Sequence, residues 1–149
     1  MTRFRIWFVI GIAIVAFSRL SQGQTAGAQP TNDDFVERIK STIAGREREP
    51  AGQVFKNVQF LKNTPAATFL MIMNGGYSNA LGVKCTYCHD DSDFASDDKR
   101  PKRAAREMQV IHRAINDQLR ALQNVTDDPN NRAISCITCH RGEVKPFRG

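Results

Sequence analysis

The chain contains two copies of one short pattern, Cys-x-x-Cys-His, at residues 85–89 and 136–140, and these copies hold all four of its cysteines. Two thiols three positions apart fall on one helical turn, where they can add to the two vinyl groups of one porphyrin. The next residue then presents its imidazole to the iron, so the pattern predicts two covalently attached haem c groups. The prediction assigns Cys85, Cys88, Cys136 and Cys139 as attachment points and His89 and His140 as iron ligands.

Other uses of paired cysteines explain the pattern less well. A zinc site of four cysteines normally has its two pairs closer together than the 47 residues that separate these pairs. Redox-active Cys-x-x-Cys pairs belong in a βαβ context that the sequence lacks, and two plain disulfides suit only an exported location. None of these alternatives explains the histidine after each pair.

The sixth ligand of each iron must come from elsewhere in the chain. Thioether sulfur is a soft ligand that raises the reduction potential of haem iron. Met73 precedes the first Cys-x-x-Cys-His pattern and Met108 precedes the second, so we expect them to ligate the two irons. Met71 is the local alternative to Met73, and His112, one turn after Met108, is the alternative at the second iron.

The first 28 residues have the build of a secretory signal peptide. Arg3 and Arg5 form a positive start, residues 6–17 are apolar, and Ala26-Gly27-Ala28 is a small-residue cleavage site. An uncleaved N-terminal membrane anchor is the alternative, although the apolar run is short for a spanning helix. We therefore expect an exported, periplasmic protein that begins at Gln29 and contacts the membrane peripherally, or through residues 1–28 if they are retained.

The basic balance of the chain does not indicate a nucleic-acid partner. The formal net charge is +6, and half of it comes from the N-terminal segment, which contains three arginines and no acidic residue. Aromatic residues are sparse, and no basic stripe is evident. Four basic residues near one predicted helix start form an ordinary solvated surface in our interpretation, with steering of a negatively charged partner as the alternative; these are Lys99, Arg100, Lys102 and Arg103.

Hydrophobic periodicity predicts a mainly α fold with few or no strands. Thr31 and Asp34 form an acidic variant of a capping box before a helix that ends near Gly45. Residues 46–52 indicate a linker, and residues 54–61 an extended or irregular segment. We expect residues 29–52 to be an N-terminal helix and linker, and residues 53–149 a domain of helix–turn–Cys-x-x-Cys-His units packed around two haems.

Two further helices precede the two cysteine patterns. Asn63 or Thr64 is expected to cap the first, with Pro65 in its first position and Gly75 and Gly76 weakening its last turns. Pro101 opens the second. An apolar stripe at spacings of three and four follows Pro101, formed by Met108, Ile111, Ile115, Leu119 and Leu122.

From about residue 54 to residue 146 the sequence resembles the cytochrome c subunit of photosynthetic reaction centres. The resemblance implies helices that carry an axial methionine before each Cys-x-x-Cys-His, which assigns Met73 to the first haem and Met108 to the second and disfavours His112. That subunit has four haems in two similar halves, and this chain matches one half. The stretches that carry the resemblance are residues 57–59, 69–73, 85–90, 105–108, 113–116 and 136–142.

The resemblance implies electron transfer to a membrane redox complex, for which a photosynthetic reaction centre is one candidate, or exchange with a soluble electron carrier. With two six-coordinate irons the protein would bind no substrate and would not be an enzyme. Two alternatives remain: a dihaem peroxidase or reductase with one open iron, and a haem-bearing structural subunit of another respiratory membrane complex.

Overall fold

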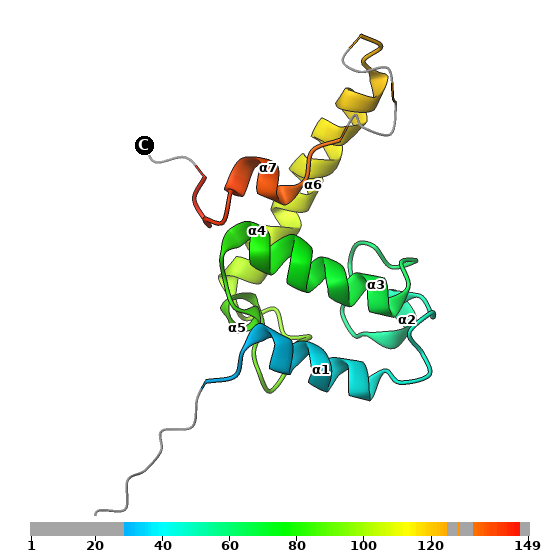
Figure 1. Cartoon of the computed structure of the whole chain (residues 1–149), viewed down its shortest axis with the longest axis vertical. Coiled ribbons are helices and arrows are strands. Elements are labelled where there is room, and N and C mark those ends of the chain that lie inside the picture. Colours follow the sequence, from blue (N-terminus) through cyan, green and yellow to red (C-terminus); the bar gives the residue numbers. More distant parts are fainter. Residues whose placement is uncertain (1–28, 125–127, 129–132, 147–149) are drawn as a thin grey trace, which may run out of the picture.

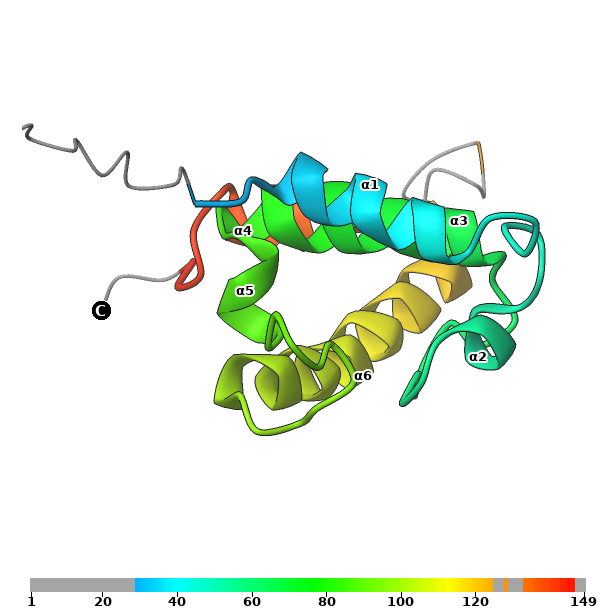
Figure 2. The same ribbon diagram turned by 90° about the horizontal axis from the view of Figure 1, so that it is seen from below.

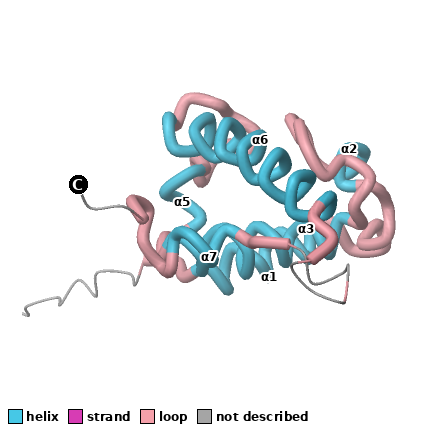
Figure 3. The backbone as a smooth tube through the Cα atoms, turned by 90° about the horizontal axis from the view of Figure 1, so that it is seen from above, coloured by secondary structure: helices cyan, strands magenta, loops and turns pink. Residues whose placement is uncertain are grey.

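The computed structural model describes residues 29–124, 128 and 133–146 (Figure 1). The predicted signal peptide and most of the predicted loop at 124–131 lie outside these residues. Within the described ranges every element is a helix, and the single β contact is an isolated bridge between Pro50 and Pro65 (Figure 3). The prediction of a mainly α fold with few or no strands is confirmed.

Helix α1 spans Asn32–Thr42 and begins as the sequence predicts. The Thr31 side chain accepts from the Asp34 N–H, and the Asp34 carboxylate accepts from the Thr31 N–H, which completes the capping box. Phe35 is buried on the face that turns inward. After α1, Gly45 adopts a positive φ of 82°, a conformation that glycine reaches without strain.

A short helix, α2 (Ala51–Val54), occupies the region where a linker and an irregular segment are expected. The segment is ordered by backbone bonds: Ala51 N–H donates to Thr64 O and Gly52 N–H to Lys62 O. These pairings are nonlocal, so the residue pattern of 46–61 alone does not predict them. The linker expectation for residues 46–52 is therefore wrong at its end, where helix α2 begins at Ala51.

One continuous helical rod carries the methionine expected at the first iron. It consists of α3 (Ala66–Met71), the π-helical segment η1 (Ile72–Ser78) and α4 (Asn79–Leu81). Pro65 is the N-cap residue, with extended ψ of 140°, so the expected cap at Asn63 or Thr64 is wrong by one or two positions. Gly82 ends the rod in the left-handed conformation.

The remaining helices carry the two cysteine patterns and the apolar stripe. Helix α5 (Cys85–Cys88) joins the end of the rod to the long helix α6 (Arg100–Ala121), and α7 is Cys136–His140. Figure 2 shows the start of α6 set apart from the rod, with α5 between them and α1 running along the rod. Helix α7 packs on α4, and the Gly142 N–H donates to Ala80 O at 2.9 Å. The two cysteine patterns are thus fixed to the same end of one rod.

Candidate haem sites

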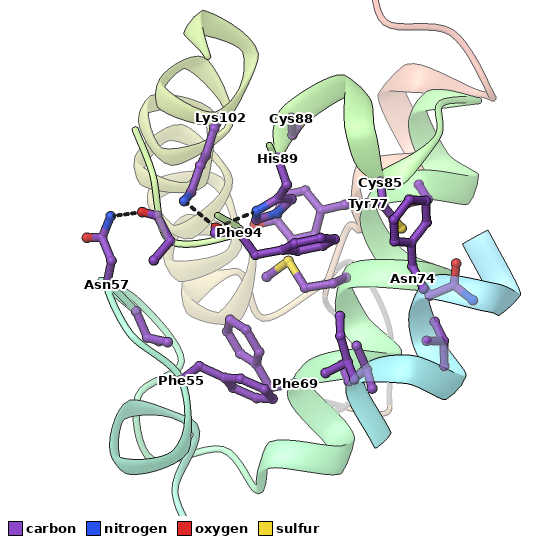
Figure 4. A pocket seen from close by; sticks show the side chains of 18 of the residues that line it. Phe55, Asn57, Phe69, Asn74, Tyr77, Cys85, Cys88, His89, Phe94 and Lys102 are labelled. Carbon is purple, nitrogen blue, oxygen red and sulfur yellow. Dashed lines mark hydrogen bonds between the residues drawn. The ribbon is translucent and has the colours of Figure 1, made fainter. Parts of the chain in front are cut away.

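The first Cys-x-x-Cys-His pattern opens onto a cavity of about 560 Å³ (Figure 4). Cys85, Cys88 and His89 line it from α5, and Met73 lines it from η1. The rest of the lining is largely apolar and aromatic, as a porphyrin requires. The aromatic residues are Phe35, Phe55, Phe60, Phe69, Tyr77 and Phe94.

Helix α1 forms part of this cavity, which the sequence did not indicate. Phe35 and Ile39 line the cavity, and the Phe35 ring lies 5.8 Å from the Phe94 ring between centroids. Arg38 and Asp91 also line the cavity and pair with each other at 2.5 Å, and the Arg38 guanidinium lies over the Phe35 ring. Residues before position 53 therefore help to enclose the first site.

The hydrogen bond of His89 leaves free the ring nitrogen that would bind a haem iron. Its Nδ1 lies 2.8 Å from the Phe94 carbonyl oxygen. Because a carbonyl only accepts, Nδ1 carries the proton and Nε2 has the free lone pair. This is the usual state of a metal-ligating histidine, whose second nitrogen donates to a carbonyl or carboxylate. Burial lowers the pKa of His89, which also favours the neutral ring.

The second pattern opens onto a smaller cavity of about 340 Å³. Cys136, Cys139 and His140 line it from α7, and Met108 lines it from α6. Met108, Ile111 and Ile115 of the α6 stripe line this cavity and are 45%, 51% and 39% exposed. Large apolar side chains that stay exposed beside an apolar cavity are what a bound porphyrin would cover.

His140 repeats the arrangement of His89. Its Nδ1 lies 3.0 Å from the carbonyl oxygen of Glu143, so Nδ1 donates and Nε2 is the free nitrogen. Arg141 and Gly142 adopt positive φ values of 53° and 86°, which turn the chain back so that the Glu143 carbonyl meets the ring. Both histidines that follow a cysteine pair thus fit the role of a haem ligand.

The two alternative ligands differ in where they lie. Met71 is 63% exposed and lines neither cavity. His112 lines the second cavity, and its Nε2 lies 2.8 Å from the Ile134 carbonyl and 2.9 Å from Asn116 Nδ2, which leaves Nδ1 as its free nitrogen. Met73 and Met108 each line one cavity, and their assignment as the sixth ligands stays a prediction.

An asparagine side chain holds the backbone just before each cysteine pattern. Asn32, at the start of α1, donates to Val83 O at 3.2 Å and accepts from Cys85 N–H at 2.8 Å. Asn116, buried on α6, donates to Ile134 O at 3.1 Å and accepts from Ile134 N–H at 2.7 Å. Sequence reasoning missed both clamps because an asparagine within a helix carries no signal of a distant partner.

The two cavities share a wall. Tyr77, Leu81 and Cys88 line both of them. Tyr77 donates from its hydroxyl to Gln109 Oε1 at 2.8 Å, which ties the rod to α6 at this wall, and burial raises the pKa of the phenol. Groups bound in the two cavities would therefore be neighbours.

The state of the cysteines argues against the other uses of the pattern. No disulfide joins any of the four, and burial raises the pKa of Cys85, Cys88 and Cys136, whereas redox-active pairs need a lowered pKa. Among the described residues no three His, Cys, Asp or Glu side chains converge on one point, so a zinc site is not supported.

For one basic residue the sequence interpretation is wrong about its surroundings. Lys102, expected on a solvated helix start, is buried, and its Nζ donates to the carbonyls of Phe94 and Ser96. Lys99 Nζ likewise donates to the Thr86 carbonyl. The acceptors lie in segments separated from α6 by several residues, so helix periodicity could not reveal them.

In each site a Cys-x-x-Cys-His turn and a methionine on a helix line one apolar cavity, and the described part of the fold has no strands. These features define the class of small c-type cytochromes. Residues 10–148 match the family described as the photosynthetic reaction centre cytochrome c subunit. The chain belongs to this family. The match begins well before residue 54, the position from which the sequence motifs carry the resemblance.

Three relatives show how much of the family this chain represents. It is 30% identical to cytochrome c-554 of Chloroflexus aurantiacus, over the whole chain and 40% of that protein. It is 34% identical to the photosynthetic reaction center cytochrome c subunit of Thermochromatium tepidum, over 64% of the chain and 22% of that protein. The corresponding subunit of Rubrivivax gelatinosus is 36% identical over 49% of the chain and 22% of its own length. The chain therefore spans less than half the length of these relatives.

Across residues 29–124 and the shorter described stretches that follow, none of the helices combines the length and the apolar character needed to cross a bilayer.

Proposed function

We propose that this protein is a dihaem c-type cytochrome that transfers electrons and catalyses no reaction of its own. One observation carries the proposal: each histidine after a cysteine pair donates from Nδ1 to a backbone carbonyl and keeps Nε2 free, beside a cavity that a methionine also lines. When bound, haem c supplies a one-electron iron couple.

The chain's own residues would attach, ligate and shield the two groups. Cys85 and Cys88 would hold the first haem, with His89 and Met73 on its iron. The equivalent residues of the second haem would be Cys136, Cys139, His140 and Met108. A methionine on each iron leaves no open coordination position, which supports a carrier over a dihaem peroxidase or reductase.

The proposed partner is a membrane redox complex at the periplasmic face. Membership of the reaction-centre cytochrome family supports re-reduction of a photo-oxidised donor as the specific role. The chain would then work in the periplasm, held to the membrane peripherally or through residues 1–28, and a soluble carrier would exchange electrons with it.

Expression in a host that assembles c-type cytochromes tests this function. The purified protein should carry the mass of two haems beyond the polypeptide and titrate as two one-electron, low-spin centres that do not bind carbon monoxide when reduced. Carbon monoxide binding at one iron in the intact protein would favour the enzyme, and a mass with no haem would end the proposal.

A further inference from the structure

The two candidate iron-ligating histidines differ in what lies behind their hydrogen bonds. The Phe94 carbonyl that accepts from His89 Nδ1 also accepts from Lys102 Nζ, each at 2.8 Å (Figure 4). His140 Nδ1 donates instead to the carbonyl of Glu143, an exposed residue that itself carries a carboxylate. A cation thus sits on the acceptor of the first histidine, and an acidic residue supplies the acceptor of the second.

The site of the Lys102 ammonium is built to hold a charge. The side chain is only 10% exposed, yet three oxygens match its three N–H groups: the carbonyls of Phe94 and Ser96, and Asp97 Oδ1 at 3.4 Å. Asp97 also pairs with Arg106 at 2.6 Å. The two cations outweigh the one carboxylate, so the group formed by Lys102, Arg106 and Asp97 carries a net positive charge beside His89.

This charge would change the reduction potential of a nearby haem in two ways that act in the same direction. A cation bonded to a carbonyl makes that oxygen a weaker acceptor, so the His89 ring would gain less basicity from its hydrogen bond and would donate less strongly to iron. The same positive charge directly disfavours the oxidised, more positive iron. Both effects raise the reduction potential.

We propose that Lys102 is a positioning residue that raises the reduction potential of the haem held by Cys85 and Cys88, acting through the Phe94 carbonyl on His89. This inference rests on the proposed dihaem function. It assigns to one buried lysine a control over the first haem, whose histidine shares its acceptor with that lysine.

Redox titration of the two-haem holoprotein, followed through NMR resonances of each haem's axial histidine, tests the proposal. In Lys102→Gln the first haem should become harder to reduce, by about tenfold in the ratio of reduced to oxidised protein, which is about 59 mV for one electron. The potential of the second haem should not change. In Lys102→Arg, which keeps the positive charge, the first haem's potential should stay close to that of the unsubstituted protein.

Arg103→Gln is the matched control. Arg103 is the next residue on α6 and is exposed, and it donates to the carbonyls of Asp97 and Asp98 in the same loop without touching Phe94. A first-haem potential that is the same in Lys102→Gln and in Arg103→Gln would overturn the proposal. Loss of both haems from the unsubstituted protein would instead overturn the proposed function.

A second variant keeps the test decisive if Lys102→Gln does not fold. Asp97→Asn removes the carboxylate that offsets the two cations, so it should shift the first haem's potential upwards, opposite in sign to Lys102→Gln. An unchanged or lowered first-haem potential in Asp97→Asn would contradict the proposal.

Discussion

The hydrogen bonds of three histidines divide them into two kinds. His89 and His140 donate from Nδ1, whereas His112 uses Nε2 and its Nδ1 is a buried atom without a partner among the described residues. Nε2 of His112 is engaged with Ile134, next to the second cysteine pattern, so ligation by His112 would have to use Nδ1. At the scale of single residues, His112 supports that segment, and the resemblance assigns the sixth ligand of the second iron to Met108.

The second iron gives the direct test of this distinction. In Met108→Ala we expect both haems to stay attached, while the second haem's potential falls and its iron opens to added ligands, because the thioether is lost. In His112→Gln the low-spin spectrum should persist. Visible spectra and carbon monoxide binding measure both results, and the reverse pattern would identify His112 as the ligand.

A matched pair of substitutions tests the proposed sixth ligand of the first iron in the same way. Met73 lines the first cavity and Met71, two residues earlier on the same rod, is exposed. Met73→Ala should convert the first haem to a form that binds carbon monoxide when reduced, and Met71→Ala should leave spectrum and potential unchanged. Ligand binding in Met71→Ala would show that the assignment on this helix is wrong.

At the scale of elements, the rod that carries Met73 changes from α to π geometry just where it meets the first cavity. Ile72–Ser78 contains Gly75 and Gly76, residues of low helix propensity that make departure from α geometry inexpensive. Met73, Asn74 and Tyr77 of this segment all line the cavity. Short π segments are frequent at functional sites, and this one belongs to the wall of a site.

The clamp from α6 to the second cysteine pattern can be tested by a graded pair of substitutions. Asn116→Ala removes both bonds to Ile134. The Ile134 carbonyl keeps its contact with His112, but its N–H is left unpaired, which should lower the free energy of unfolding by about 1–3 kcal/mol. Asn116→Asp keeps an acceptor for the Ile134 N–H but buries a carboxylate against the Ile134 carbonyl, so its cost should fall when acid protonates that carboxylate. Urea unfolding of the holoprotein measures both, and equal stability of Asn116→Ala and wild type would show that the clamp contributes nothing.

Local pattern predicted those elements whose causes are local. The Thr31 capping box predicted the start of α1, and Pro101 with the stripe from Met108 predicted α6. The stripe also gave the second cavity its apolar wall, although it indicated nothing of what the stripe would face. The burial of Lys102 was missed because it depends on carbonyls in a loop that packs against α6 only in the folded chain.

At the scale of the whole molecule, two cavities are fixed against each other by one junction. Tyr77, Leu81 and Cys88 stand between them, and α7 is bound to α4 through the Gly142 N–H and Ala80 O. Short separation is what rapid exchange between two one-electron centres requires. The relative position of the two sites therefore depends on how closely α4 and α7 approach.

Gly82 sets that approach. A Cβ at this position would lie 2.1 Å from Gly142 O, and φ is +64°. Gly82→Ala should therefore cost about 1–2 kcal/mol for the left-handed backbone and about 1–3 kcal/mol more for the overlap. Gly45→Ala is the matched control, since its φ of +82° carries the same strain with nothing within 4 Å. Thermal unfolding of the holoproteins should show a larger loss for Gly82→Ala, together with slower electron exchange between the haems. Equal losses for the two variants would mean that α4 and α7 separate without cost, and that the junction does not hold the two sites in place.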